Sequence, residues 1–360
     1  MGKTSAATRT FRLFATHVNT RETRDLTPFE NVLAYPIHWD NRHKNEVLIA
    51  LNKEDPRAHD AYRLNIVTGE LALAAKNPGN VNGWASDGNL NIKAAWASDE
   101  SGGASLLVRD DAAESGWRPI GTWDADDALT SRLDGLSYDG GTAYLHDSRE
   151  ANAGRFVKVS IANGVAGDRQ VIAEDAHYDA GQVIFHLDSY EPQLVAFTRA
   201  RQEWVVLDET IRADVDAIQK IHPGDFSLIN RDHADQIWLI EFSTDDGPVA
   251  YYAYDRRTQH ATFLFHSHPA LTQHSLAHIE PISFAARDGL TLHGYITYPF
   301  GVTGAARQNL PLVLDVHGGP WGRNGWGFDS QTQWFANRGY ACLQVNFRGS
   351  TGYGKAFCQR

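Results

Sequence analysis

The chain has 360 residues, of which 42% are hydrophobic, enough for two domains with buried cores and too many for a largely disordered protein. Its formal net charge of −11 argues against nucleic acid as a partner, because a surface that binds nucleic acid needs clustered Lys and Arg. The two cysteines, Cys342 and Cys358, make no disulfide framework, so a cytoplasmic location is expected. No apolar run is long enough to span a membrane, and no secretory signal is expected.

Residues 10–280 predict many short strands and almost no helix. Apolar and polar residues alternate over short stretches, and turn residues such as Asp245-Asp246-Gly247 separate them. The alternating stretches are Val47–Leu51, Tyr62–Ile66, Leu106–Val108, Phe156–Ile161, Leu194–Phe197, Ile237–Phe242 and Tyr251–Tyr254. The segment Glu209–Ile221 has helical propensity, but the repeat pattern described next favours a turn and a strand there.

A repeat of about 47 residues runs through this part of the chain. Each copy has a strand, a small polar residue, a turn and a second strand. The polar residues are Asn19, Asn65, Asp110, Ser160, Asp208 and Asp255. This length suits a four-stranded β-propeller blade, which needs its neighbours to bury its faces. We therefore predict a mainly β fold with a propeller of about six blades, the first incomplete because few residues precede Asn19. The alternative is a β-sandwich with accidental spacing.

Residues 266–281 form a junction that is rich in His and Pro. Five histidines lie close together in and just before it, and His274 and His278 have the i, i+4 spacing of metal ligands on a helix. No Cys and no suitably placed carboxylate accompanies them in the sequence. A polar linker is therefore favoured, and neither a metal site nor a cofactor is predicted.

After the junction the pattern becomes that of an α/β domain. The apolar run Leu310–Val316 is followed by the glycine turn His317-Gly318-Gly319-Pro320. An amphipathic stretch, Ser330–Arg338, then precedes a second apolar strand, Ala341–Phe347, and a glycine loop, Arg348–Gly354. Strand, loop, helix and strand in this order begin a parallel sheet. A His-Gly-Gly loop directly after a buried strand can point backbone N–H groups at a developing oxyanion.

These loops carry a family resemblance. His317-Gly318-Gly319-Pro320-Trp321, followed by Asn346-Phe347-Arg348-Gly349-Ser350-Thr351-Gly352-Tyr353-Gly354, resembles the prolyl oligopeptidase family of serine peptidases, and most of all its acylaminoacyl-peptidase-like branch. The resemblance implies a β-propeller over residues 1–280 and the N-terminal part of an α/β-hydrolase (peptidase) domain over residues 281–360. It also implies short peptides as substrates of the intact enzyme and a Ser-His-Asp acyl-transfer mechanism.

The triad of that family is not found in the sequence. An α/β-hydrolase carries its serine on a G-x-S-x-G turn, with Asp and His later in the chain. The nearest string, Arg348-Gly349-Ser350-Thr351-Gly352, has Arg where the first Gly is needed, so Ser350 is not predicted to be the nucleophile. By the resemblance all three residues lie beyond Arg360. The chain is therefore expected to be a fragment that is inactive alone.

The resemblance implies that a backbone N–H in the turn Gly318-Gly319 is one donor of the oxyanion hole. His317 and Pro320 are expected to support this loop, with His317 fixing the turn by hydrogen bonding rather than acting as a base. The alternative is a plain turn at the end of a strand.

Three further residues, Trp321, Asn346 and Arg348, are candidates for lining the substrate cleft, although Asn346 and Arg348 could equally hold the loop. The tryptophans Trp321, Trp326 and Trp334 are expected to pack in the hydrolase core.

Two other functions stay open, a non-catalytic propeller scaffold with a vestigial hydrolase segment and a fragment of an esterase. The sequence does not indicate an oligomeric state.

Overall fold

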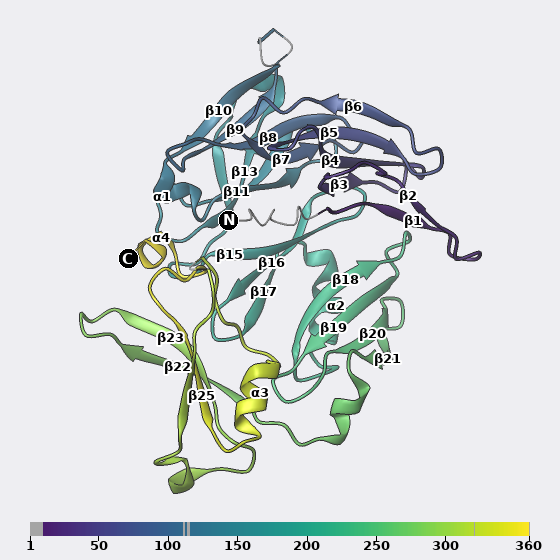
Figure 1. Ribbon diagram of the computed structural model, residues 1–360. Coiled ribbons are helices and arrows are strands. Elements are labelled where there is room, and N and C mark those ends of the chain that lie inside the picture. Colours follow the sequence, from purple (N-terminus) through teal and green to yellow (C-terminus); the bar gives the residue numbers. More distant parts are fainter. Residues whose placement is uncertain (1–9, 111, 114–115, 320, 360) are drawn as a thin grey trace, which may run out of the picture. The chain divides into compact units, whose positions relative to one another are not determined.

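The computed structural model describes residues 10–110, 112–113, 116–319 and 321–359 (Figure 1). By contacts between Cα atoms the chain divides into two compact units. The first comprises Met1–Arg149, Phe156–Ile172 and Asp188–Glu191, and the second comprises Glu150–Arg155, Ala173–Leu187 and Pro192–Arg360. Within the described ranges, no helix is both long and apolar enough to cross a membrane.

In the part of the chain that the structure describes, six sheets of consecutive strands precede residue 270, as expected of propeller blades. The first is a two-stranded hairpin, β1 (Phe14–Thr16) and β2 (Thr23–Asp25). The next is β3 (Ala34–Trp39), β4 (Glu46–Asp55), β5 (Ala58–Asn65) and β6 (Leu71–Ala75). Then come β7 (Val81–Ser86), β8 (Ile92–Ser98), β9 (Ala104–Arg109) and β10 (Trp117–Trp123), and the short helix α1 (Ala125–Ala128). The fourth sheet is β11 (Arg132–Leu136), β12 (Thr142–Asp147), β13 (Arg155–Ser160) and β14 (Arg169–Ala173).

The fifth sheet has three strands in place of four. It consists of β15 (Ala180–Phe185), β16 (Pro192–Thr198) and β17 (Gln202–Val206), followed by helix α2 (Arg212–Ile218). The sixth is β18 (Asp225–Arg231), β19 (Ile237–Ser243), β20 (Ala250–Asp255) and β21 (His260–His266). All seven stretches predicted from alternation lie in strands, apart from single residues at some ends. The incomplete first sheet agrees with the predicted incomplete first blade.

The polar residue of the predicted repeat has the same place in each sheet. It lies at or just after the end of β1, β5, β9, β13, β17 and β20. Side chains of four of them, Asn65, Asp110, Asp208 and Asp255, accept a hydrogen bond from the backbone N–H two residues later. Asn and Asp form such turns readily because the side chain replaces a backbone acceptor. The repeat visible in the sequence is therefore a repeat of turns.

Neighbouring sheets share their hydrophobic cores. On β8, Ala94 and Trp96 belong to a cluster that includes Leu145 and Val157 of the following sheet. The alternate residues Ala95 and Ala97 belong to another cluster, which includes Leu48 of the preceding sheet and others. Because successive side chains of a strand point to opposite faces, each sheet contributes to two cores. This arrangement explains why neither face of β8 is polar.

The prediction of a turn and strand over Glu209–Ile221 is wrong. Residues Arg212–Ile218 form helix α2, at the place in the chain where the four-stranded sheets have their fourth strand. Asp208 accepts from the backbone N–H of Thr210 and begins the short 3-10 turn that leads into the helix. Ile211, Val215 and Ile218 are buried at helical spacing against β19 and β20 in one core cluster. Helical propensity and burial of this apolar stripe therefore decide the structure of the segment, although the repeat pattern predicted a strand.

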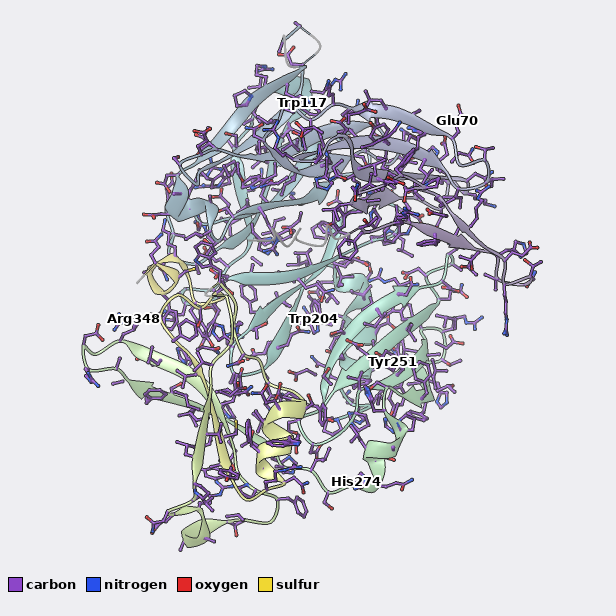
Figure 2. The ribbon with its side chains drawn as sticks, viewed as in Figure 1. Glu70, Trp117, Trp204, Tyr251, His274 and Arg348 are labelled. Carbon is purple, nitrogen blue, oxygen red and sulfur yellow. The ribbon has the colours of Figure 1, made fainter. Side chains whose placement is uncertain are left out.

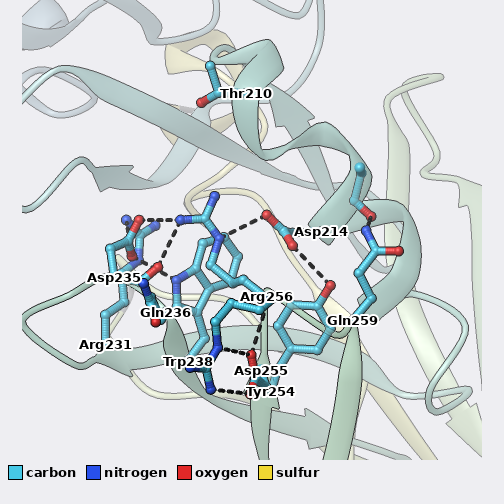
Figure 3. A network of polar contacts seen from close by, with 12 residues as sticks. Thr210, Asp214, Arg231, Asp235, Gln236, Trp238, Tyr254, Asp255, Arg256 and Gln259 are labelled. Atoms are coloured by element: carbon cyan, nitrogen blue, oxygen red, sulfur yellow. Dashed lines mark hydrogen bonds and ion pairs between the residues drawn. The ribbon is translucent and has the colours of Figure 1, made fainter.

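Helix α2 is tied to the sixth sheet by a network around Arg256 (Figure 3). Arg256 Nε donates to Asp214 Oδ2 at 2.9 Å, and its Nη1 contacts Asp235 Oδ2 at 2.5 Å. The hydroxyl of Tyr254 donates to the other oxygen of Asp214 at 3.0 Å, and burial together with this bond raises the pKa of Tyr254. The guanidinium also lies 4.7 Å from the ring centroid of Trp238. Asp214 is buried and depends on this cation for compensation of its charge.

We expect Arg256→Met to lower the free energy of unfolding by about 2–4 kcal/mol, because it leaves the buried Asp214 carboxylate without its cation. Urea denaturation followed by tryptophan fluorescence measures this loss. The adjacent Arg257 is a matched control, since it pairs with Asp255 at the surface and Arg257→Met should change stability little. Equal losses for the two variants would contradict the assignment.

A second buried carboxylate, Asp147, lies in the first unit. It accepts from Trp123 Nε1 at 2.9 Å, Arg149 Nη2 at 2.8 Å and Arg169 Nη1 at 2.9 Å. Burial alone would raise the pKa of Asp147, but the hydrogen bonds from Arg149 and Trp123 outweigh it and lower the pKa to about 2. A carboxyl with a depressed pKa in the folded state stabilises the fold at any pH above its unfolded pKa.

This stabilisation should disappear as the pH falls from about 4 toward 2, where the folded carboxylate becomes protonated. From the shift we expect Asp147 to contribute ~2 kcal/mol at neutral pH. Asp147→Asn should therefore destabilise the protein at pH 7 and reduce the dependence of stability on pH below 4. Urea midpoints measured at several pH values for both proteins check this. Parallel pH profiles for the two proteins would contradict it.

The last sheet differs in topology from the first six. Its order is β22 (Ile279–Ala285), β23 (Thr291–Thr297), β25 (Ala341–Asn346) and β24 (Leu312–Asp315). The first two strands form an antiparallel hairpin, and β24 and β25 pair in parallel through helix α3 (Ser330–Ala336). A last short helix, α4, covers Lys355–Cys358. The predicted start of a parallel sheet is confirmed.

Candidate functional site

The candidate site lies where two parallel strands end. Because β24 and β25 run in the same direction, the loops that follow them leave the sheet at the same edge. The first of these loops contains His317-Gly318-Gly319, and the second contains Gly349–Gly354. Between the strands, Asp329 accepts from the backbone N–H of Thr332 and begins α3, which lies beside β25 in Figure 1. The two motifs, about thirty residues apart in sequence, therefore meet in space.

His317 joins the two loops. Its Nδ1 lies 2.9 Å from the carbonyl oxygen of Gly318, which can only accept, so Nδ1 carries the proton. Nε2 is then free to accept from Ser350 Oγ at 2.8 Å. The imidazole also stacks on Phe347, with the ring centroids 4.4 Å apart and the planes inclined by 17°. These contacts agree with the expectation that His317 fixes the turn.

Ser350 donates to a histidine but lies in the wrong place for a nucleophile. Its side chain is 0% exposed, so a substrate carbonyl cannot reach Oγ. The partner of His317 Nδ1 is a backbone carbonyl in place of the carboxylate of a triad. The geometry therefore supports the sequence prediction that Ser350 is not the nucleophile, and its bond to His317 indicates that it holds the loop. Sequence reasoning did not foresee that its partner is His317.

The two glycines of the candidate oxyanion loop have different surroundings. A Cβ on Gly318 would meet no atom within 4 Å. Gly319 has φ +140°, and its Cβ would lie 2.6 Å from the backbone nitrogen of Trp321. Only glycine fits the second position without strain. Pro320, predicted to support the loop, lies outside the described residues, and the role of the two glycines as oxyanion donors stays a prediction.

The candidate cleft residues have distinct positions. Asn346 is fully buried, with Oδ1 accepting from the backbone N–H of Asn324 at 2.7 Å and Nδ2 donating to the Tyr353 hydroxyl at 2.7 Å. It holds the loop, the second of the two roles considered for it. Arg348, labelled in Figure 2, forms an ion pair with Asp288 in the turn between β22 and β23. A backbone hydrogen bond from Leu290 lowers the pKa of Asp288, and the contact with Arg348 adds to this effect.

The expectation that the tryptophans pack in the hydrolase core is wrong for two of them. Trp321 is 65% exposed and Trp334 is 53% exposed. Helix α3 buries Thr332, Gln333 and Ala336, so Trp334 lies on its outer face under the guanidinium of Arg338. Trp326 is half-buried beneath Arg201 at 3.8 Å. The exposure of Trp321 beside the oxyanion loop fits its alternative role as a cleft residue.

A cluster with metal-ligand spacing occurs among the described residues at Asp245, Asp246 and His278. His278 Nδ1 lies 3.2 Å from Asp245 Oδ2, and its Nε2 lies 3.8 Å from Asp246 Oδ2. Asp245 Oδ2 also accepts from the backbone N–H of Ile279 at 2.8 Å. Both imidazole nitrogens thus face carboxylate oxygens from the turn Asp245-Asp246, which the sequence analysis did not place beside these histidines. His274, its proposed partner in the sequence, does not belong to the cluster.

Both cysteines are unpaired and buried. Burial, with a smaller effect of Asp315, raises the pKa of the Cys342 thiol to about 12. A neutral thiol is a poor nucleophile, so Cys342 fills space in β25.

Comparison with known proteins gives the same family as the loops. The sequence profile described as "Prolyl oligopeptidase family" matches residues 326–360. Over 351 residues the chain is 37% identical to dipeptidyl aminopeptidase BIII of Pseudoxanthomonas mexicana, an alignment that covers 96% of this chain and 50% of the relative. Over 343 residues it is 27% identical to dipeptidyl peptidase family member 6 of Caenorhabditis elegans, covering 86% and 45%. The chain thus spans about half the length of the curated relatives it matches.

Solved structures agree on the fold. A puromycin-hydrolyzing peptidase of Mycobacterium tuberculosis has a TM-score of 0.65 at 15% identity, over 96% of this chain and 56% of that one. The acylaminoacyl peptidase of Pyrococcus horikoshii has a TM-score of 0.58 at 15% identity, over 97% and 56%. The fold and the glycine loop define a β-propeller protein with the beginning of an α/β-hydrolase domain. The chain belongs to the prolyl oligopeptidase family.

The two glycines give a direct test of the loop geometry. We expect Gly319→Ala to lower the free energy of unfolding by about 1–3 kcal/mol, because a Cβ there is both strained and in contact with the backbone. Gly318→Ala, whose Cβ meets open space, should have a much smaller effect. Urea denaturation of the two single variants measures the difference. Equal losses would show that the loop conformation differs from the one described.

Proposed function

We propose that this chain is part of a serine peptidase that hydrolyses short peptides by acyl transfer. The observation that carries the proposal is the 37% identity to a dipeptidyl aminopeptidase over 96% of the chain, which includes the propeller as well as the glycine loops. An esterase would be expected to share the loop but seldom the propeller. The relatives' names favour release of dipeptides from a free N-terminus over removal of an acylated residue.

In this mechanism a serine hydroxyl attacks the carbonyl carbon of the peptide, and negative charge develops on the carbonyl oxygen. Backbone N–H groups of the turn Gly318-Gly319 would stabilise that charge, a contribution worth about 10²–10³ in kcat per donor in serine proteases. The hydrogen bond between His317 and Ser350 supports the proposal, because it fixes the turn against a second loop. Preorganised donors need no rearrangement during the reaction.

We propose further that the nucleophile, base and orienting acid come from outside these 360 residues. The sequence contains no G-x-S-x-G string, and Ser350 is inaccessible. Relatives about twice as long have room for all three. The 360-residue polypeptide alone would then be inactive. A cytoplasmic location is proposed with it, supported by two unpaired, buried cysteines.

A fluorophosphonate probe tests both parts of the proposal. The 360-residue polypeptide should not be labelled, and the full product of the gene should be labelled at a serine outside this sequence. That product should hydrolyse a dipeptidyl coumarin amide with a free N-terminus faster than its N-acetyl counterpart. Mass spectrometry identifies the labelled peptide, and fluorescence measures the rates.

Each other outcome has a definite meaning. Labelling of Ser350 would refute its structural role. Preference for the N-acetyl substrate would favour an acylaminoacyl peptidase. Absence of labelling and of hydrolysis in the full gene product would leave the non-catalytic propeller as the better interpretation.

A further inference from the structure

The loop Gly349–Gly354 is held by two residues from far earlier in the chain. Asp179 precedes β15 and Asn152 precedes β13, and both belong to the second compact unit with the loop. Asp179 Oδ2 accepts from the backbone N–H groups of Gly352 at 3.1 Å and Gly354 at 3.3 Å. Its Oδ1 accepts from Gly154 N–H at 2.7 Å, and its own N–H donates to the carbonyl of Gly352.

Asn152 adds two bonds just beyond the loop. Its carbonyl oxygen accepts from the backbone N–H of Lys355 at 2.9 Å, and its Oδ1 accepts from that of Ala356 at 3.0 Å. The fit is close, because a Cβ on Gly354 would lie 2.2 Å from Asn152 Nδ2. The segment from Gly352 to Ala356 is thus bonded to two side chains of the earlier chain.

The glycine spacing of the loop follows from this anchoring. Gly352 has φ +90° and Gly354 has φ +79°, conformations that turn their N–H groups toward one carboxylate oxygen. Both φ values favour glycine, because other residues rarely adopt them without strain. The acceptor that these N–H groups bind is the protein's own carboxylate, Asp179. Hydrogen bonds to a charged acceptor are stronger than neutral ones, so Asp179 is the strongest single restraint among these bonds.

The restraint continues to the candidate oxyanion loop. Ser350, in the same glycine loop, donates to His317 Nε2 at 2.8 Å. The backbone N–H of the next residue, Thr351, donates to the carbonyl of Gly322 at 2.9 Å. Two bonds therefore join the anchored loop to both sides of the turn Gly318-Gly319.

We infer that Asp179 is a positioning residue for the oxyanion loop, acting through the Gly349–Gly354 loop and the bond between Ser350 and His317. The inference rests on the proposed function in so far as it concerns catalysis. The hydrogen bonds of Asp179 described above go to Gly154 and to the glycine loop, so its effect on His317 is expected to pass through that loop. Losing it should loosen the bond between Ser350 and His317 while leaving the sheet intact.

Nitrogen NMR of the histidine rings tests this in the 360-residue protein without any need for activity. Asp179→Asn keeps the shape of the side chain but turns an amide toward backbone N–H donors. We expect the His317 Nε2 resonance to move toward its value in Ser350→Ala. Amide exchange at Gly352 and Gly354 should accelerate about tenfold or more, as expected for loss of hydrogen bonds to a charged group.

Asp208→Asn is the matched control. Asp208 also accepts from a backbone N–H and from side chains, Thr210 and Gln193, within the second unit but away from these loops. It should leave the His317 resonance unchanged. If Asp179→Asn does not fold, Asn152→Ala should move the resonance less, in the same direction. A folded Asp179→Asn protein with the wild-type His317 resonance, whatever its melting temperature, would overturn the inference.

Kinetics separates the inference from the proposed function. In a gene product that hydrolyses the dipeptidyl amide, Asp179→Asn should lower kcat about tenfold with little change in KM, as expected for a group that acts on the transition state alone. Unchanged kcat together with an unchanged resonance would refute the positioning role and leave the peptidase proposal standing. A moved resonance without any hydrolysis, even by the wild type, would refute the peptidase proposal and leave the coupling standing.

Discussion

The parallel pairing of β24 with β25 is the constraint on which the candidate site depends. An antiparallel pair would send the two following loops to opposite edges of the sheet. In the parallel arrangement His317 and Ser350 leave neighbouring strands at the same edge and can form their 2.8 Å bond. Helix α3 makes this pairing possible, since it carries the chain back along the sheet between the two strands. The contact between Ser350 and His317 therefore follows from the crossover connection β24–α3–β25.

Sequence patterns predicted the architecture well because the relevant signals are local. Alternation located the strands, and the small polar residues at Asn65, Asp110 and Asp208 marked turns that their own side chains stabilise. The start of the parallel sheet was visible from the order of apolar runs and glycine loops. A boundary between the domains near residue 280 stays a prediction, although the change from consecutive sheets to the mixed sheet occurs there.

What the sequence did not reveal depends on contacts between distant residues. The helical propensity of α2 was visible in the sequence but was set aside in favour of the repeat, because the burial of Ile211, Val215 and Ile218 against the neighbouring core was not visible. Asp179 lies 173 residues before Gly352, and an aspartate followed by alanine in a loop carries no local sign of that partner. The burial of Ser350 supports setting it aside as a nucleophile, but its histidine partner could not be found without knowing which loops meet. Burial and pairing over such distances are properties of the fold.

The anchoring of the glycine loop has a consequence for how this protein can be divided. The segments Glu150–Arg155 and Ala173–Leu187 belong to the second unit by their contacts, although they connect strands of the consecutive sheets. A polypeptide that begins at residue 280 would keep the whole Gly349–Gly354 loop but would lack Asp179 and Asn152, whose side chains hold this segment. Recombination between two relatives at residue 280 would combine the glycine loop of one protein with the residues at positions 152 and 179 of the other. The backbone N–H groups of the loop would then face acceptors from a different protein. A segment that keeps the glycine loop together with the side chains that bind it must therefore begin at Asn152 or earlier.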